Sequence, residues 1–435
     1  MRRRKFFTNF VSICLLAIVG TLLSSFLTGY LVYGVGKISG VFAMSPLEAL
    51  IFGTLISATD PVTVLSIFSK LGVTDNLYAM VFGESVLNDA VAIVLFQALG
   101  NFLGDSVDGP GVGRAIGDFF KIFFGSIAIG WGSGVITSIL TKYGKWPPDA
   151  YYVEVCLITA VAYASYMLAE ATKLSGIVAI LFNGITSAHY SSHNITREAN
   201  DLAHGFFHSL AFFFESLVFV FLGVSMANLT FNEKGLIPLL FLTIPIVLLS
   251  RACNIYPLCT LANTRRKKDR QIPVSFMHVM FMSGLRGAIA FALAARTNDP
   301  EGGYNLHVGR VIFTITSIVV LLTVMIPGGM MPWLLKRLRV PCGEDANAAA
   351  VPGVVAGSPT DRRLTVTVAS ALDFDRKYFK VWFTNRERDA FGHCSRNAQQ
   401  ELHSVADELS QVDTPKPLAE PVTPTVKDAV GTDQL

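Results

Sequence analysis

The stretches IFGTLISATDPVTVLSIF (residues 51–68) and VFGESVLNDAVAIVLF (residues 81–96) decide the fold class of this chain. Both lie within long apolar runs, and a short polar island interrupts each run. The islands are Thr59, Asp60 and Pro61 in the first stretch and Glu84, Ser85, Asn88 and Asp89 in the second. A carboxylate at bilayer depth costs roughly 2.5 to 3.5 kcal/mol on insertion scales, and such residues mark ion or proton pathways. The two stretches therefore predict a membrane protein that moves ions.

The composition of the chain agrees with a polytopic membrane protein. Of its 435 residues 51% are hydrophobic and only 15% are charged, and the mean hydropathy is +0.49. The basic residues fall into a few loops and tails, so the formal net charge of +3 predicts no nucleic-acid partner. None of the six cysteines forms a CxxC pair, and neither a metal site nor a cofactor is expected.

Ten apolar segments, each of roughly 20 residues, predict ten membrane-spanning helices. The segments are residues 11–34, 47–70, 77–100, 118–141, 150–170, 174–189, 205–227, 235–262, 274–296 and 308–334. An even number of spans places both termini on one side, together with basic clusters such as residues 2–5 and 265–270. By the positive-inside rule this side is the cytosol. We therefore expect an all-α membrane domain, surrounded by lipid, with both termini cytosolic.

The composition changes abruptly near residue 341, where the hydrophobic runs stop. Residues 1–340 are predicted to form the membrane domain, and residues 341–361, rich in Ala, Gly and Pro, a flexible linker. Residues 362–390 contain enough β-branched and aromatic residues for one short cytosolic element. Residues 391–435, with four prolines among polar residues, predict a disordered tail.

Pro61 predicts an interruption in the helix that contains the first island. Proline has no N–H and its ring clashes with the carbonyl one turn earlier, so the helix should break between Ser57 and Pro61. The freed carbonyls, with the side chains of Thr59 and Asp60, would offer oxygen ligands for Na⁺ or K⁺ at mid-membrane. The alternative is a kink used only for packing, in which Asp60 caps the broken helix.

The second island predicts a polar stripe on one face of its helix. Glu84 and Asn88 are one turn apart, as are Ser85 and Asp89, so the stripe should face the protein interior. A desolvated Asp89 would release its proton when a cation binds and take it up again when the cation leaves, which is antiport in its simplest form. The alternative is an aspartate held permanently by hydrogen bonds. The candidate ion- and proton-binding residues are Asp89, Asn88, Ser85, Asp60 and Thr59.

Arg286, inside the apolar run 274–296, requires a carboxylate because arginine is always charged. Glu84 is a better partner than Asp89, since a permanent arginine partner would stop Asp89 from exchanging protons. We therefore predict a structural ion pair between Glu84 and Arg286. The glycines near Arg286, at positions 284 and 287, predict a second irregular helix that approaches the first closely.

Two further features are less specific. Asn194 and Asn228 each begin an Asn-x-Thr glycan acceptor pattern, and only Asn228 falls on the non-cytosolic side in this topology. Glu215 is another buried acid, for which a structural role and a gating role are equally open.

Five motifs of this chain resemble, in order, those of a known family. The stretches 51–68 and 81–96, followed by LSGIVAILFNGI (174–185), FESLVFVFLGVS (214–225) and GLRGAIAFALA (284–294), resemble the sodium/proton exchangers of the eukaryotic cation/proton antiporter family. The resemblance runs from about residue 6 to residue 340. The motif sequences SATDPVTVLSIF and GESVLNDAVAI are more similar to those of the organellar branch than to those of the plasma-membrane branch. The organellar branch contains exchangers of endosomes, Golgi and prevacuolar compartments.

The resemblance implies a broken-helix, inverted-repeat antiporter fold and a homodimer. It implies an ion site at Asp89 beside Asn88, with Thr59 and Asp60 contributing. It also implies the ion pair between Glu84 and Arg286. It implies electroneutral exchange of one Na⁺ or K⁺ for one proton across an organellar membrane, which would regulate luminal pH and cation content. Family members carry about thirteen spans, so by comparison about three N-terminal helices are missing from this chain.

Two other functions remain open at this point. One is a non-transporting partner of a longer exchanger, because part of the first repeat is missing by comparison with the family. The other is an intramembrane aspartyl protease with Asp60 and Asp89 as its catalytic dyad. The Tyr-Asp and Gly-x-Gly-Asp patterns of such proteases are absent from the sequence.

Overall fold

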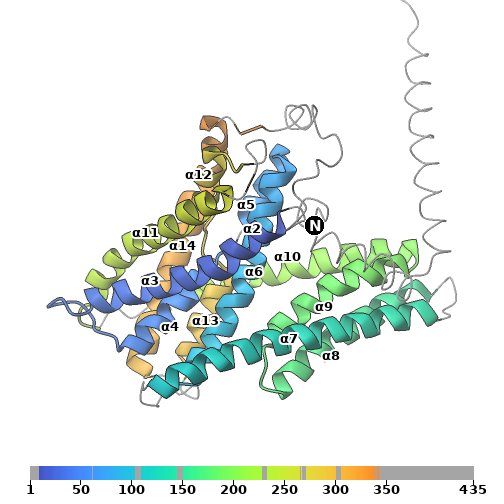
Figure 1. The fold of residues 1–435 in the computed structure, drawn as a ribbon, viewed down its shortest axis with the longest axis horizontal. Helices are drawn as coiled ribbons and strands as arrows, with labels where there is room; N and C mark the ends of the chain where they lie inside the picture. The colour runs from blue at the N-terminus through green and yellow to red at the C-terminus, as the bar shows by residue number, and fades with distance from the viewer. Residues whose placement is uncertain are drawn as a thin grey trace, which may run out of the picture. The chain divides into compact units, whose positions relative to one another are not determined.

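The computed structural model describes residues 9–60, 62–102, 109–144, 150–227, 233–264, 266, 271–299, 305–338 and 340–341. The predicted linker, cytosolic segment and tail lie outside the described residues, apart from Pro341. Regular structure within the described ranges is helical, as predicted (Figure 1). The helices are α2 (Phe10–Cys14), the π-helical η1 (Leu15–Val19), α3 (Gly20–Val35), α4 (Pro46–Ser57), α5 (Val62–Leu71), α6 (Asp75–Gly100), α7 (Gly109–Tyr143), α8 (Tyr151–Ala171), α9 (Gly176–Tyr190), the 3₁₀ turn η3 (Ser191–His193), α10 (Arg197–Ala227), α11 (Leu236–Thr264), α12 (Val274–Met282), α13 (Ala288–Thr297) and α14 (Leu306–Arg337).

Seven helices in the described ranges are long and apolar enough to cross a membrane, in agreement with a multi-pass membrane protein. They are Phe10–Val35, Asp75–Gly100, Gly113–Tyr143, Tyr151–Ala171, Arg197–Ala227, Leu236–Thr264 and Leu306–Arg337. The predicted number of ten is not confirmed, because three of the predicted runs do not form one long helix. The run 174–189 forms the 15-residue α9, and the runs 47–70 and 274–296 each form two short helices.

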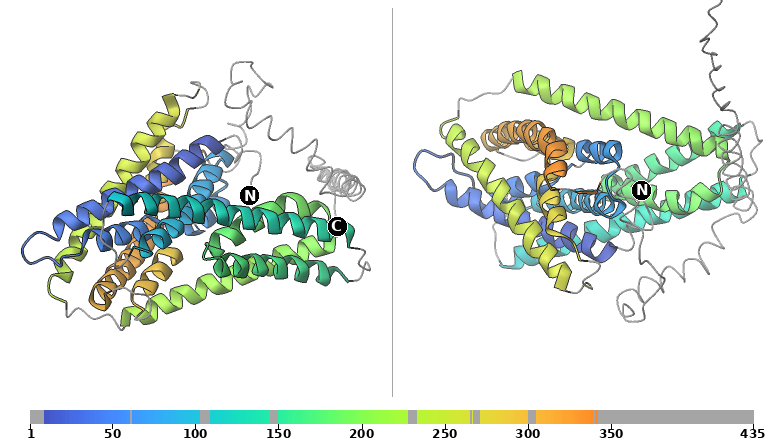
Figure 2. Two further views of the ribbon diagram at one scale, coloured as in Figure 1. Left: turned by 60° about the horizontal axis from the view of Figure 1, so that its bottom comes forward. Right: turned by 90° about the horizontal axis from the view of Figure 1, so that it is seen from above.

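The helices form two groups of neighbours (Figure 2). In one group α7, α8 and α9 pack against one another, and α10 packs on α8. The other group contains α2 to α6 and α11 to α14. Helix α6 packs against α4 and α5 and also against α7 and α9. The helix that carries the second polar island therefore contacts both groups.

The two interrupted helices meet at their interruptions. The chain is non-helical between α4 and α5 and again between α12 and α13. The N–H of Asp60, in the first interruption, donates to the carbonyl of Leu285, in the second, at 2.9 Å. Pro61, the predicted cause of the first interruption, lies outside the described residues. Crossed discontinuous helices are the usual way in which secondary transporters expose polar backbone at membrane depth.

A polar layer separates two apolar clusters along α6. The first turns of α6 contribute Leu77 and Met80 to one cluster, which also contains residues of α5 and α12. Its later turns contribute Ile93 and Phe96 to the other cluster, which contains residues of α4 and α13. The second polar island lies between them on α6. Buried polar groups in such a layer are costly unless they are hydrogen-bonded, so their partners determine the site.

The close packing of α3 on α4 depends on Gly29 and Gly53. A methyl group on Gly53 would lie 2.6 Å from the backbone nitrogen of Gly29, which cannot move aside as a flexible side chain can. We expect Gly53→Ala to lower the free energy of unfolding by roughly 1 to 3 kcal/mol, seen as a lower melting temperature. Gly34→Ala is the matched control on α3, because a methyl group there meets nothing within 4 Å. Equal melting temperatures for the two variants would contradict the prediction.

Candidate functional site

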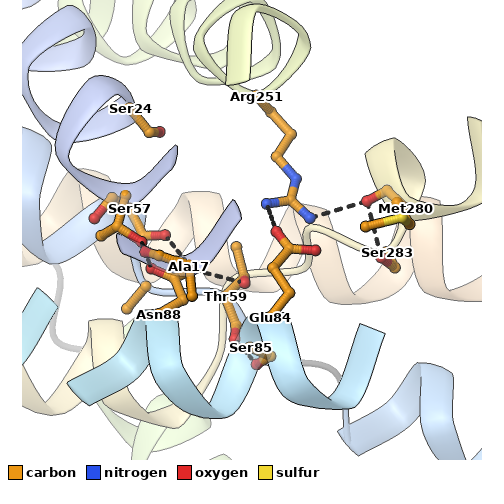
Figure 3. A network of polar contacts seen from close by, with 12 residues as sticks. Ala17, Ser24, Ser57, Thr59, Glu84, Ser85, Asn88, Arg251, Met280 and Ser283 are labelled. Carbon is orange, nitrogen blue, oxygen red and sulfur yellow. Dashed lines mark hydrogen bonds and ion pairs between the residues drawn. The ribbon is translucent and has the colours of Figure 1, made fainter. Parts of the chain in front are cut away.

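Ser85 and Asn88 of α6 bind the backbone at the end of α4 (Figure 3). Nδ2 of Asn88 donates to the carbonyl of Ser57 at 3.1 Å and to the hydroxyl of Thr59 at 2.9 Å. The hydroxyl of Ser85 donates to the carbonyl of Thr59. The structure thus brings together three of the predicted site residues, Thr59, Ser85 and Asn88, and buries all three. The carbonyls freed by the interruption are bonded to protein donors.

Arg286 lies at the carboxyl end of α4. Its Nη1 is 3.5 Å from the carbonyl of Ala58, the residue that caps α4. Its backbone N–H donates to the hydroxyl of Thr323 at 3.1 Å. The side chain is only 1% exposed, and a positive charge is favourable beside the unpaired carbonyls at a helix C-terminus. Arg286 therefore supports the interruption in the other crossed helix.

Asp60 lies at the amino end of α13. A Cβ atom on Gly287, the residue that precedes α13, would lie 2.6 Å from Cγ of Asp60, so only glycine leaves room for this side chain. A carboxylate is favourable at a helix N-terminus, where backbone N–H groups are unpaired. Each interruption therefore supplies the charge that suits a helix end in the other one.

Asp89, the predicted cation- and proton-binding residue, follows Asn88 on α6 and is half-buried. Within the described part of the chain we find no hydrogen bond to its carboxylate. Asp60 interacts electrostatically with Asp89 and with Glu215 of α10. The negative charge of Asp60 therefore acts on both of these acids.

Glu84 forms its ion pair with Arg251 of α11, so the predicted pair with Arg286 is wrong. Nη1 of Arg251 lies 2.5 Å from Oε1 of Glu84, and Nη2 donates to the carbonyl of Met280 at 2.9 Å (Figure 3). Both members of the pair are buried. The ion pair therefore ties α6 to α11 and to the last turn of α12.

The sequence did contain a signal for Arg251. This residue stands near the middle of the apolar run 235–262, where an arginine needs a carboxylate as much as Arg286 does. A Cβ atom on Gly284 would lie 3.0 Å from Cδ of Arg251. The glycine that predicted a close approach of two helices therefore leaves room for an arginine side chain.

Thr21 is a second residue of the site that sequence reasoning missed. Its hydroxyl oxygen lies 2.5 Å from Oδ1 of Asn88. Its signal was a set of polar residues at helical spacing in the first apolar run. These residues are Thr21, Ser24, Ser25 and Thr28.

The two glycan acceptor patterns differ in what the structure describes. Asn228, the predicted acceptor, lies outside the described residues. Asn194 is fully buried, and its Nδ2 donates to the carbonyl of Ser138 at 3.0 Å. The side chain of Asn194 is therefore not accessible for modification in this fold.

Comparison with known proteins identifies a family. The family model described as sodium/hydrogen exchanger, transmembrane, matches residues 1–337. Sodium/hydrogen exchanger 5 of Arabidopsis thaliana is 38% identical over 358 residues, which cover 81% of this chain and 67% of the plant protein. Human sodium/hydrogen exchanger 9 is 36% identical over 409 residues, which cover 88% of this chain and 61% of the human protein. Rat sodium/hydrogen exchanger 8 is 37% identical over 362 residues, which cover 80% of this chain and 59% of the rat protein.

The fold is also similar to a solved structure. The sodium proton antiporter MjNhaP1 from Methanocaldococcus jannaschii, at pH 8, matches with a TM-score of 0.61 and 19% sequence identity. The match covers 78% of this chain and 81% of MjNhaP1. It supports the predicted antiporter fold. Alignment to the three curated relatives spans 59 to 67% of their length.

Proposed function

Because this chain belongs to the sodium/hydrogen exchanger family, we propose that it exchanges a monovalent cation for a proton across a membrane. It would act as a secondary transporter that needs no cofactor, and not as an intramembrane protease. The observation that carries the proposal is the environment of Asp89. This acid lies on the 26-residue apolar helix α6, at the crossing of two interrupted helices, and no described residue forms a hydrogen bond with its carboxylate.

In the proposed cycle the carboxylate of Asp89 binds either a cation or a proton. The ionised form attracts the cation, and when the cation leaves, a proton neutralises the carboxylate. The neighbouring Asn88 is uncharged, and Glu84 is neutralised by Arg251 at 2.5 Å. One exchanging carboxylate therefore moves one positive charge in each direction, so the exchange should be electroneutral.

We further propose that the site accepts K⁺ as well as Na⁺. The carbonyls of Ser57 and Thr59 are bonded to side chains of α6, and that of Ala58 lies 3.5 Å from Arg286. Each of these three carbonyls already has a donor within the protein. A cation bound to Asp89 would then keep much of its hydration shell, and discrimination by ionic radius would be weak.

The resemblance to the organellar branch supports an endomembrane location, in endosomes, Golgi or a prevacuolar compartment. Exchange there would regulate luminal pH and cation content. The basic clusters at residues 2–5 and 265–270 support cytosolic termini. We also propose a homodimer, as the family resemblance implies.

Reconstitution of the full chain into liposomes tests the proposed function. With a pH-sensitive dye inside, an imposed gradient of either Na⁺ or K⁺ is expected to drive proton flux in the opposite direction. The same vesicles on a solid-supported membrane should give no cation-dependent current, because each cycle moves no net charge. A cation-dependent current would contradict the one-to-one stoichiometry, and flux with Na⁺ alone would contradict the proposed K⁺ acceptance.

A further inference from the structure

Thr21 connects the first helix of the chain to the candidate site. It lies in the first turn of α3, directly after the π-helical segment η1, and is 2% exposed. Its hydroxyl oxygen is 2.5 Å from Oδ1 of Asn88. One turn later, Ser25 donates to the hydroxyl of Ser57 at 3.0 Å. One face of α3 therefore contacts both α6 and the end of α4, next to a π-helical turn of the kind often found at functional sites.

The carboxamide of Asn88 is fixed in one orientation by its neighbours. The carbonyl of Ser57, at 3.1 Å, can only accept, so the Nδ2 side of the carboxamide must face it. The other N–H of Nδ2 faces the hydroxyl of Thr59 at 2.9 Å. Oδ1 is then directed at α3, where the hydroxyl of Thr21 is the donor. If the carboxamide were flipped by 180°, its Oδ1 would face the carbonyl oxygen of Ser57, and neither of these atoms can donate a hydrogen bond.

We propose that Thr21 is a positioning residue of the cation site and that it acts through Asn88. This inference rests on the proposed function, in which Asp89 binds the cation. The hydroxyl of Thr21 holds Asn88 in the orientation that fastens α6 to the end of α4, and thereby fixes Asp89 relative to Asp60. In this proposal Asn88 connects the helices by hydrogen bonds. It is not a ligand of the cation, although its position beside Asp89 first indicated that role.

The hydrogen bond of Thr21 can be separated from its packing. The hydroxyl has one hydrogen and two acceptors in reach, Oδ1 of Asn88 and the carbonyl of Ala17 one turn earlier. Valine keeps the shape of threonine but donates no hydrogen bond, whereas serine keeps the donor and loses a methyl group. If the hydrogen bond is what matters, the valine variant is impaired and the serine variant is not.

We expect Thr21→Val to raise the half-saturating Na⁺ concentration for exchange about tenfold, as when a residue that orients a metal ligand is removed. The maximal rate and the amount of folded protein should stay within about twofold of wild type. The variant loses affinity for the cation equally before and during the transport step, so only the half-saturating concentration changes. Thr21→Ser should restore the wild-type half-saturating concentration. Thr243→Val is the matched control, because Thr243 is fully buried and donates within α11, to the carbonyl of Leu239 at 2.8 Å.

A double-mutant cycle with Asn88→Ala tests whether Thr21 acts through Asn88. The losses in melting temperature from Thr21→Val and Asn88→Ala should not add, because both remove one interaction. Fully additive losses would overturn the proposal. So would an unchanged half-saturating concentration in Thr21→Val, or equal impairment of Thr21→Ser and Thr21→Val.

The failure of this inference can be told from the failure of the proposed function. Na⁺ should raise the melting temperature of the purified wild-type protein, since a ligand that binds the folded state stabilises it. A wild type with neither exchange nor this rise would overturn the proposed function and the role of Thr21 with it. If only the role of Thr21 is wrong, the wild type responds to Na⁺ and Thr21→Val responds at the same concentrations.

Discussion

Asp89→Asn is expected to abolish cation-driven proton flux and to leave the amount of folded protein unchanged. The amide keeps the shape of the carboxyl group but carries no charge and exchanges no proton, so it supports neither half of the cycle. The measurement is proton flux into dye-loaded proteoliposomes under a Na⁺ or K⁺ gradient, and the expected flux is that of protein-free vesicles. The physical basis is a single carboxylate that alternates between cation and proton.

The control for this variant lies on the same helix. Asp75→Asn makes the same chemical change at an exposed residue in the first turn of α6, outside the polar layer, and its flux should equal that of the wild type. Exchange at the wild-type rate by Asp89→Asn would remove Asp89 from the mechanism. A loss of flux in both variants would point instead to a general effect of charge on α6.

Breaking the ion pair between Glu84 and Arg251 is expected to produce the largest loss of stability. Glu84→Gln leaves the buried guanidinium of Arg251 unpaired, and Arg251→Met leaves the buried carboxylate unpaired, each at a cost of about 3 to 5 kcal/mol. The double variant should lose less than the sum of the two single losses, because it leaves no buried charge alone. The measurement is the melting temperature and the yield of folded protein in detergent.

The same experiment distinguishes the observed pair from the one expected from sequence. Glu84→Gln combined with Arg286→Leu should be closer to additive, because Arg286 lies at the end of α4, 3.5 Å from the Ala58 carbonyl, and makes no direct contact with Glu84 among the described interactions. Strong coupling of Glu84 with Arg286 and full additivity with Arg251 would reverse this assignment.

The fold class and much of the candidate site follow from local properties of the sequence. Apolar runs predict helices because backbone groups in a membrane must be bonded within their own segment. The first polar island and the glycines around Arg286 predicted two irregular helices, and both helices are interrupted at these places. The spacing of Ser85 and Asn88 predicted that they share a face, and both of them bind the end of α4. Periodicity and helix breaking depend only on neighbours in the chain.

Only the tertiary structure decided which buried groups meet. Glu84 pairs with Arg251, 167 residues away, and Asn88 meets the hydroxyl of Thr21, 67 residues away. The sequence contained these residues and gave reasons to seek partners for them. The choice between Arg251 and Arg286 depends on the rotation and depth of α11 and α12 against α6, which the packing of whole helices sets. Helix spacing tells which residues share a face, but not which helix that face contacts.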